Sequence, residues 1–250
     1  MPPDRTPFPK SAFEALAQAE ARHWWFRARN RVIIWVLKSR IGKIRNFLEI
    51  GCGTGFVLEG IHQEFPETTL SGTEFFEEGL MHARRRVPSA SFEKLDARAM
   101  SDAERFDVIG AFDVIEHIDE DEQVLANLSR ALHKDGHLLL TVPQHRWLWS
   151  AADERACHVR RYTRRELVDK VGRAGLEVQY VTSFVTLLVS LMWLARQRPG
   201  QKNADVNSEF DISDRTNRLL EFVMKIELGL LKAGITFPLG GSLLLLAKKP

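Results

Sequence analysis

A short stretch near residue 50 combines one acid with three glycines at alternate positions. Glu49 ends an apolar run, Gly51, Gly53 and Gly55 follow, and a helical pattern opens at Phe56. Glycine lets a backbone turn sharply with positive φ and lets a ligand approach without a Cβ in the way. The order strand, tight turn, helix therefore predicts a nucleotide-type site at the carboxyl end of the first strand of an α/β sheet. It is not the dinucleotide fingerprint G-x-G-x-x-G, because Phe56 stands where that motif has its last glycine.

An acid further along has a position suited to a nucleoside. Glu74 ends a predicted strand at 69–74 and lies 19 positions after Gly55 (74 − 55). An acid at the end of the second strand of such a sheet accepts hydrogen bonds from a ribose diol. The simpler alternative is an acid that opens the next helix, where the helix dipole favours it.

Three histidines could supply acid–base chemistry. His117 follows an apolar run at 106–112, and His145 and His158 follow another at 137–143. Imidazole titrates near neutral pH, so each of them could accept a proton from a hydroxyl or an amine. The alternative for each is a structural histidine that hydrogen-bonds the chain around it.

Alternating strands and helices are predicted to position these residues. Apolar runs predict strands at 46–50, 69–74, 91–94, 106–112, 137–143, 176–181 and 242–247, and helical periodicity predicts helices at 55–64, 77–86, 120–132, 164–174 and 214–233. A turn at Lys134–Gly136 is expected to end the third of these helices. This alternation predicts an α/β fold, in which ligands bind at the carboxyl ends of the strands.

The first segment of the chain lies outside this alternation. The first 45 residues contain a proline-rich arm at 1–10 and a helical pattern at 11–41, with Ser11 as its N-cap. In that pattern Trp24 and Trp25 are either part of a hydrophobic lid over a substrate or packing anchors against the sheet.

The glycine-rich stretch also resembles a known sequence motif. Residues 48–55, Leu-Glu-Ile-Gly-Cys-Gly-Thr-Gly, resemble motif I of the class I S-adenosylmethionine-dependent methyltransferases, and later motifs match in order. Residues 106–120 resemble the FDVV…DVLEH segment of small-molecule enzymes of ubiquinone and menaquinone biosynthesis. The resemblance covers roughly residues 46–180 and the last strand.

The resemblance implies a fold and a division of the chain. The expected fold is a Rossmann-like, seven-stranded methyltransferase sheet, mostly parallel with the last strand antiparallel, flanked by helices. The expected parts of this single domain are an arm and helical cap (1–45), an S-adenosylmethionine-binding core (46–182), a helical insertion (183–241) and the last core strand (242–250).

The resemblance also implies which residues hold the methyl donor S-adenosyl-L-methionine, whose product is S-adenosyl-L-homocysteine. Glu49 and the glycine turn are expected to hold its aminoacyl end and ribose, Glu74 to bind the ribose diol, and Asp96 to bind the adenine amino group. For Asp96 the alternative is a turn residue. The implied donor-binding residues are Glu49, Gly51, Cys52, Gly53, Gly55, Glu74, Phe75, Asp96, Ala97, Phe112, Asp113 and Val114.

Residues 142–162 match a subset of the family with a Val-Pro-x-x-x-x-Leu-Trp-Ser…Asp…Gly-His-x-Arg-Arg-Tyr pattern. Ala156 and Cys157 depart from it, since they replace the small residue and the glycine before the histidine. Such a mixture of basic and aromatic residues can orient a polar head group and cover an apolar portion. We therefore expect substrate contacts from this stretch, with a capping or charge-network role as the alternative. The expected contacts are His145, Trp149, His158, Arg161 and Tyr162, together with Trp24 and Trp25.

A metal is the alternative reading of the histidine segment. Small-RNA 3′-end methyltransferases place a Glu-x-x-Glu-His cluster here, with a later histidine, on a divalent ion. Asp113, Glu116 and His117 match that spacing, and either His145 or His158 could supply the distant ligand. The same Glu-His pair is widespread in metal-free relatives and no basic track for RNA is visible, so we expect no metal.

Composition and the insertion limit the partners. A net charge of +2 selects neither nucleic acid nor an acidic surface. Two cysteines and an N-terminus without an apolar signal indicate the cytoplasm, with a membrane face as the alternative. The apolar segment at 184–195 is too short for a bilayer, which takes about 20 residues. Its alternatives are helices packed on the sheet, a substrate tunnel, a homodimer face or peripheral membrane docking.

The reaction expected from the resemblance is methyl transfer by SN2 displacement to a small, partly apolar acceptor. Lipid-linked or natural-product intermediates are the favoured acceptors. Two alternatives stay open: a methyltransferase that acts on RNA or protein, and a non-catalytic regulatory protein that only binds the donor.

Overall fold

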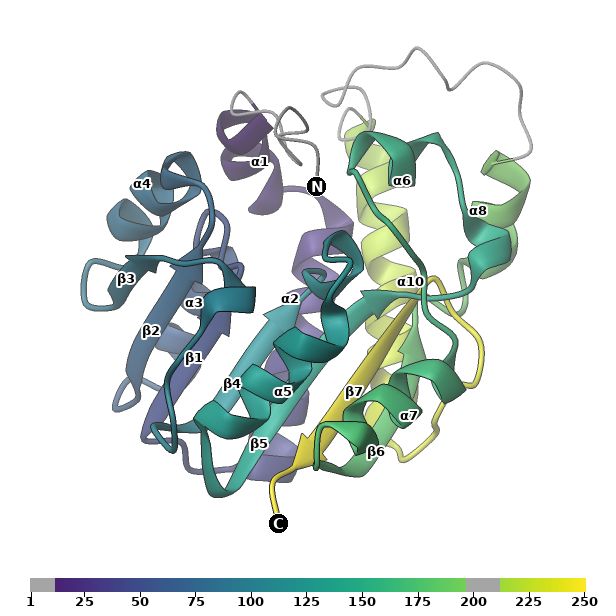
Figure 1. Cartoon of the computed structure of the whole chain (residues 1–250). Helices are drawn as coiled ribbons and strands as arrows, with labels where there is room; N and C mark the ends of the chain where they lie inside the picture. The colour runs from purple at the N-terminus through teal and green to yellow at the C-terminus, as the bar shows by residue number, and fades with distance from the viewer. Residues whose placement is uncertain (1–11, 197–211) are drawn as a thin grey trace.

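A single mixed sheet forms the centre of the molecule (Figure 1). The computed structural model describes residues 12–196 and 212–250, and the predicted arm at 1–10 lies outside them. Within the described residues the sheet has seven strands in the order β3-β2-β1-β4-β5-β7-β6, and β7 runs opposite to the other six. The strands are β1 (Asn46–Ile50), β2 (Thr69–Glu74), β3 (Ser91–Lys94), β4 (Phe106–Phe112), β5 (Leu132–Pro143), β6 (Glu177–Phe184) and β7 (Ser242–Lys248). This architecture confirms the predicted fold.

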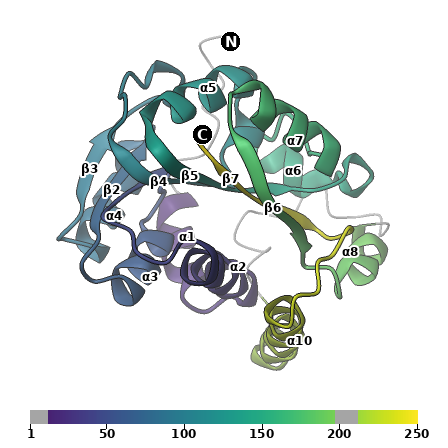
Figure 2. The same ribbon diagram turned by 90° about the horizontal axis from the view of Figure 1, so that it is seen from below.

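Helices cover both faces of the sheet, as the end-on view shows (Figure 2). One face packs against α2 (Trp24–Val36), α3 (Phe56–Glu64), α4 (Glu77–Arg86) and α10 (Asp214–Lys232). The other packs against α5 (Asp121–Ala131) and α7 (Arg164–Arg173). Strands buried on both faces need continuous apolar runs, and the run Leu243–Leu246 of β7 is fully buried.

The predicted N-terminal helix is interrupted. It forms α1 (Ala12–Glu20) and α2, with a wide helical turn at Leu37–Ile41, and Ser11 lies outside the described residues. At the break the His23 side chain accepts a hydrogen bond from the Trp25 amide. The Asn217 side-chain oxygen, from α10, accepts one from the Trp24 amide at 2.7 Å. The insertion thus holds the start of α2, a long-range contact that periodicity does not reveal.

Two predicted boundaries were wrong. β5 begins at Leu132, directly after α5, so the turn predicted at Lys134–Gly136 lies inside the strand. The pairing of β5 with β4 is irregular there. Asp135 has a φ of +65°, and regular pairing resumes at His137. The apolar segment at 184–195 is divided, because Phe184 ends β6 and α8 (Val189–Arg196) begins only after a turn.

A buried carboxylate holds that turn in place. Glu227 of α10 accepts hydrogen bonds from the backbone amides of Val185, Thr186 and Leu187 at 2.6, 2.7 and 2.9 Å. Val185 has a φ of +58°, unusual for a β-branched residue, and these bonds fix it. Among residues 12–196 and 212–250, no helix is long and apolar enough to cross a membrane.

Candidate functional site

The glycine turn packs against the end of β4. Gly51 has a φ of +63°, and a Cβ added there would lie 2.6 Å from Cγ2 of Val114. Only glycine fits both the backbone angle and the space. The Gly55 amide closes the turn on the Cys52 carbonyl at 2.8 Å. Two predicted donor segments, one after β1 and one after β4, are therefore in contact.

Glu74 connects the glycine turn with the end of β2. One carboxylate oxygen accepts from the amides of Phe75 and Phe76 at 2.8 and 3.1 Å, and the other from the Gly53 amide at 3.0 Å. Burial raises the pKa of this carboxyl, while the three amides oppose the rise. Glu74 thus lies beside the turn, where a ribose-binding acid is expected.

Glu49 is a buried acid facing a buried arginine. It is 3% exposed, and burial raises its pKa well above the usual value while the positive charge of Arg29 opposes that rise. The guanidinium of Arg29, from α2, forms an ion pair with Asp113 at the end of β4 and lies 4.7 Å from the centre of the Trp25 ring. Arg29 was not among the predicted site residues. The feature of the sequence that could have indicated it is its position one helical turn after the tryptophan pair, on the same helix.

A second contact joins the N-terminal helices to the turn. Glu20 of α1 is buried and accepts a hydrogen bond from the Thr54 hydroxyl, between two of the glycines. Arg86 of α4 donates to both Glu20 and Thr54 at 2.8 Å. The cap expected from the sequence is therefore attached to the donor loop itself.

Asp96 follows β3, and the Leu95 amide donates to the Glu74 carbonyl at 3.1 Å, so the β2 and β3 ends adjoin. The Asp96 carboxylate accepts from the side chain of Arg98 at 2.7 Å and from its amide at 2.9 Å. These bonds hold the pKa of Asp96 below its ordinary value. A donor adenine would have to share this acid with Arg98. Ala97 is buried in the short helical turn that follows, and Phe112, also buried, ends β4.

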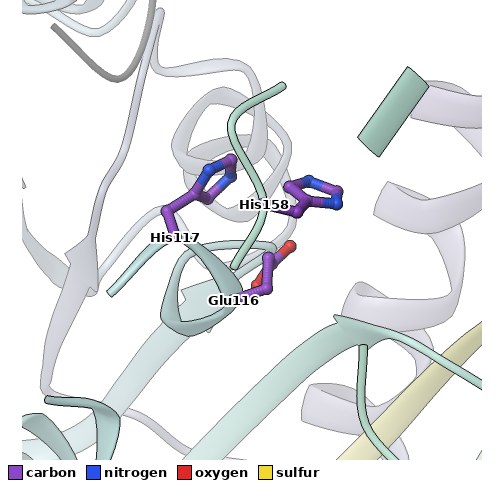
Figure 3. A group of neighbouring side chains, drawn as sticks. All are labelled: Glu116, His117 and His158. Atoms are coloured by element: carbon purple, nitrogen blue, oxygen red, sulfur yellow. The ribbon is translucent and has the colours of Figure 1, made fainter. Parts of the chain in front are cut away.

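The predicted histidines divide into two sets. His117, in the 3₁₀ turn Ile115–His117 after β4, packs edge-on against His158 with ring centres 4.7 Å apart. Figure 3 shows both rings beside the carboxylate of Glu116. His145 lies outside this group, stacked on Trp147 with ring centres 5.4 Å apart. Burial lowers the pKa of His117 to about 4, so its imidazole is neutral at neutral pH.

Arg161 and Tyr162 have other partners than a substrate. Arg161 donates to Asp153 at 2.6 Å and to the Gln144 carbonyl at 3.1 Å. Tyr162 is fully buried, and its hydroxyl donates to Asp121 at 2.7 Å. These contacts favour structural roles over the predicted substrate contacts. They agree with the charge-network role that the sequence offered as the alternative for this stretch.

The predicted tryptophans belong to different elements, and Trp24 and Trp25 pack against the hydrophobic core, as the packing-anchor alternative expects. Trp24 and Trp25 are half-buried at the start of α2, and Trp25 packs edge-on against Phe26 with ring centres 4.9 Å apart. Trp149 is half-buried between the turn Arg146–Leu148 and α6 (Ala151–Arg155). Trp25 reaches the donor segments through Arg29.

Comparisons with known proteins agree with this arrangement. The chain is 30% identical over 117 residues to malonyl-[acyl-carrier protein] O-methyltransferase of Bacillus cereus, which covers 45% of this chain and 44% of that protein. It is 29% identical over 161 residues to a probable S-adenosylmethionine-dependent methyltransferase of Mycolicibacterium smegmatis, covering 63% and 61%. The chain thus spans between 44% and 61% of the length of these relatives.

A solved structure shares the fold. Phosphoethanolamine N-methyltransferase 2 of Haemonchus contortus, in complex with S-adenosyl-L-methionine, superposes with a TM-score of 0.65 at 17% identity, covering 99% of this chain and 59% of that one. A family model described as a methyltransferase domain matches residues 13–181. With a match over more than half of its length, this chain belongs to the methyltransferase domain family.

Proposed function

We propose that this protein is an S-adenosyl-L-methionine-dependent methyltransferase that acts on a small, partly apolar acceptor. The observation that carries the proposal is the convergence of three strand ends. Gly51 contacts Val114, and the Gly53 amide donates to Glu74, so the segments after β1, β2 and β4 lie side by side. Ligands of open α/β sheets bind at such carboxyl ends.

The donor is expected to use the residues that the motifs indicate. Glu74 accepts the ribose hydroxyls, Glu49 and the glycine turn hold the aminoacyl end, and Asp96 faces the adenine amino group. Arg29 is a further donor residue, because a buried guanidinium beside Asp113 suits the carboxylate of an amino-acid moiety. S-Adenosyl-L-methionine supplies a methyl group on a sulfonium, and the protein positions the acceptor in line with it.

The acceptor end of the site contains the predicted bases. When bound, S-adenosyl-L-methionine would supply its methyl group to an acceptor oxygen or nitrogen, and its sulfur would keep the electron pair of the broken bond. The proton of the acceptor passes to a histidine. A neutral imidazole can take it, and the lowered pKa of His117 keeps that ring neutral. Burial and the charge of Arg161 likewise lower the pKa of His145.

An apolar surface on α8 and α10 favours a lipid-like acceptor at a membrane face. Leu191 and Leu194 of α8 are 55% and 57% exposed, and Leu219 and Phe222 of α10 are 61% and 60% exposed. Arg218 and Lys225 flank Phe222 and are exposed as well. An amphipathic helix with basic residues beside its apolar face suits the surface of an anionic bilayer. With both cysteines unpaired, we place this surface on the cytoplasmic side.

Donor binding and methyl transfer can be tested separately. Calorimetry should show binding of S-adenosyl-L-methionine and its demethylated product, and methyl-labelled donor with a metabolite extract of the host should label a small molecule in the lipid fraction. Label in RNA or protein would replace the small acceptor with a polymer. Donor binding without any labelled product would favour a regulatory protein. No binding of either nucleoside would refute the proposal.

Membrane contact has its own test. The protein should sediment with vesicles of phosphatidylglycerol and phosphatidylcholine, and Leu219→Ser with Phe222→Ser should reduce the bound fraction several-fold. Met81→Ser, an exposed apolar residue on α4, is the matched control and should bind as the wild type does. If instead the double variant abolished a dimer seen by analytical ultracentrifugation and vesicles bound nothing, the surface would be a homodimer face.

A further inference from the structure

A fully buried carboxylate, that of Glu116, lies beside two imidazoles and has no role in the donor or acceptor binding proposed above. Glu116 is 0% exposed, and neither of its carboxylate oxygens has a hydrogen-bond partner in another of the described residues. A buried carboxylate without partners is costly, because it loses its hydration and gains nothing in return. A bound proton or a bound cation would neutralise the charge of such a group and so stabilise it.

The nearest side chains are nitrogen ligands. One ligand atom each from Glu116, His117 and His158 lies within 4.8 Å of the other two, and Figure 3 shows the rings and the carboxylate turned toward a common space. Asp113 does not take part, because Arg29 already pairs with it. His145 does not take part either, because it stacks on Trp147.

His158 is held as metal-binding histidines are held. Its Nδ1 lies 2.9 Å from Oδ1 of Asp153, a carboxylate that is 1% exposed. A histidine that gives one ring N–H to a carboxylate presents the other nitrogen, Nε2, as a lone pair of fixed direction. Asp153 is itself fixed, since it also accepts from Arg161 and from the Ser150 amide.

The backbone joins the two segments that supply the ligands. The Val159 amide donates to the Glu116 carbonyl at 2.8 Å, so the residue after His158 is attached to the turn that carries the other two ligands. Cys157, directly before His158, has a φ of +56°. Non-glycine residues in that region are uncommon and concentrate at functional sites.

We propose that Glu116, His117 and His158 form a binding site for a divalent transition-metal ion, with Zn²⁺ as the best fit. Two imidazoles and one carboxylate are a ligand set typical of catalytic zinc, which leaves a fourth position for water or an acceptor oxygen. Ligands of tetrahedral zinc lie about 3.3 Å apart, so side-chain rotation of the three residues closes the site around the ion. The ion would neutralise the charge of Glu116, and His117 and His158 would both serve as its ligands.

This inference differs from the expectation of a metal-free site and goes beyond the proposed function. It does not depend on the acceptor, since metal binding is measured without one. If both rings hold the ion, His145 remains as the base for the transferred proton. Nε2 of His145 is buried and has no hydrogen-bond partner among the described residues.

The experiment uses the purified full-length chain, treated with EDTA, dialysed and titrated with ZnCl₂ in a calorimeter. We expect one equivalent to bind, and Co²⁺ to give the strong visible absorption of a four-coordinate site. Glu116→Gln and His158→Gln should weaken Zn²⁺ binding at least about 100-fold. Asp153→Asn, which removes only the partner of a ligand, should weaken it about 10- to 100-fold. His62→Gln on α3 is the control and should bind as the wild type does.

Folding and donor binding are measured on every variant. Each should melt cooperatively and bind S-adenosyl-L-homocysteine within about threefold of the wild type, so that a loss of metal is not mistaken for a loss of fold. If Glu116→Gln does not fold, His158→Gln decides. Less than a tenth of an equivalent of Zn²⁺ in the wild type, or equal binding by the wild type and His158→Gln, would overturn the proposal.

Discussion

The donor and acceptor regions of the site are built in different ways. The donor region uses backbone: one turn with three glycines, and Glu74 held by the two amides that follow it and by the Gly53 amide of that turn. The acceptor region uses side chains from segments far apart in the sequence, such as Glu116 with His158, and Tyr162 with Asp121. Short motifs can specify the first kind of region, whereas only the fold assembles the second.

The two regions also handle buried charge differently. In the donor region Glu49 has no ion pair with any residue of 12–196 or 212–250, and its pKa is raised well above the usual value, largely by burial. In the acceptor region Asp121 pairs with Arg160 and Lys170 at 2.6 and 2.5 Å. Glu49 is thus a buried acid that a ligand can stabilise, as Glu116 is in the acceptor region, whereas Asp121 belongs to a framework of ion pairs formed within the chain. Mutations can test this contrast.

Arg29→Met should have the largest effect, because Arg29 pairs with Asp113 at the end of β4 and its charge also acts on Glu49. Its loss leaves the half-buried Asp113 without its cation and removes the charge that opposes the raised pKa of Glu49. Breaking one partner of a buried pair costs about 3–5 kcal/mol. Urea denaturation should show a loss in that range, and calorimetry should show weaker donor binding.

Two further variants sharpen the Arg29 result. Asp113→Asn in the Arg29→Met background should recover part of the lost stability, since it removes the uncompensated charge. Arg31→Met, on the same helix but 30% exposed at its side chain, should cost much less. Equal losses of stability for Arg29→Met and Arg31→Met would show that the pair of Arg29 with Asp113 contributes no more than the more exposed pair of Arg31.

Asp121→Asn should destabilise the acceptor framework alone, by about 3 kcal/mol. Burial by itself would raise the pKa of Asp121, but hydrogen bonds from Lys170, Tyr162 and Arg160 outweigh it and hold the pKa below its usual value. The stability that the ionised carboxylate supplies is therefore complete above its unfolded pKa of about 3.9 and is lost as the pH falls through the lower folded value.

The measurement is urea denaturation from pH 7 down to pH 3. The difference between wild type and Asp121→Asn should be constant above about pH 5 and shrink below pH 4, while donor affinity at pH 7 stays the same. Asp169→Asn, whose pair with Arg165 is exposed, should change stability little. A difference that persisted undiminished at pH 3 would contradict the assignment.

Gly51→Ala should damage the donor region alone. The new Cβ would meet Val114 at 2.6 Å with the backbone at positive φ, so the turn must move. Calorimetry should show donor binding at least about 100-fold weaker, which is about 2.8 kcal/mol. Gly172→Ala is the control, because nothing lies within 4 Å of its added Cβ and α7 should become slightly more stable. Unchanged donor binding by Gly51→Ala would show that the glycine turn does not hold the donor.

The same contrast explains what the sequence could predict. The strands and their order along the chain followed from apolar runs, and Glu49, Gly51 and Glu74 followed from local spacing. All seven strands were found, and β1 to β4 matched their predicted bounds. These features depend on residues within one turn or strand of each other, which a sequence shows directly.

What the sequence could not supply were contacts across long separations. The pair of Arg29 with Asp113 joins residues 84 positions apart, and the bonds of Asn217 to the start of α2 span nearly 200. The choice between His145 and His158 as the partner of His117 also depended on how two loops pack. The start of β5 was misjudged because Gly136 favours a turn, whereas Leu132 already pairs with Phe106 of β4 and the regular pairing resumes at His137 after an irregularity.

Thr163→Ala should have the smallest effect and fall in the acceptor framework. Thr163 caps α7: its hydroxyl accepts from the Glu166 amide at 3.2 Å, and the Glu166 carboxylate accepts from the Thr163 amide. Loss of an N-cap costs about 1 kcal/mol. Because α7 packs on the face of the sheet opposite α2 and α3, donor binding should not change. Thr163→Ser should keep full stability in urea, and a fall in donor affinity with Thr163→Ala would mean that the two regions are coupled through the sheet.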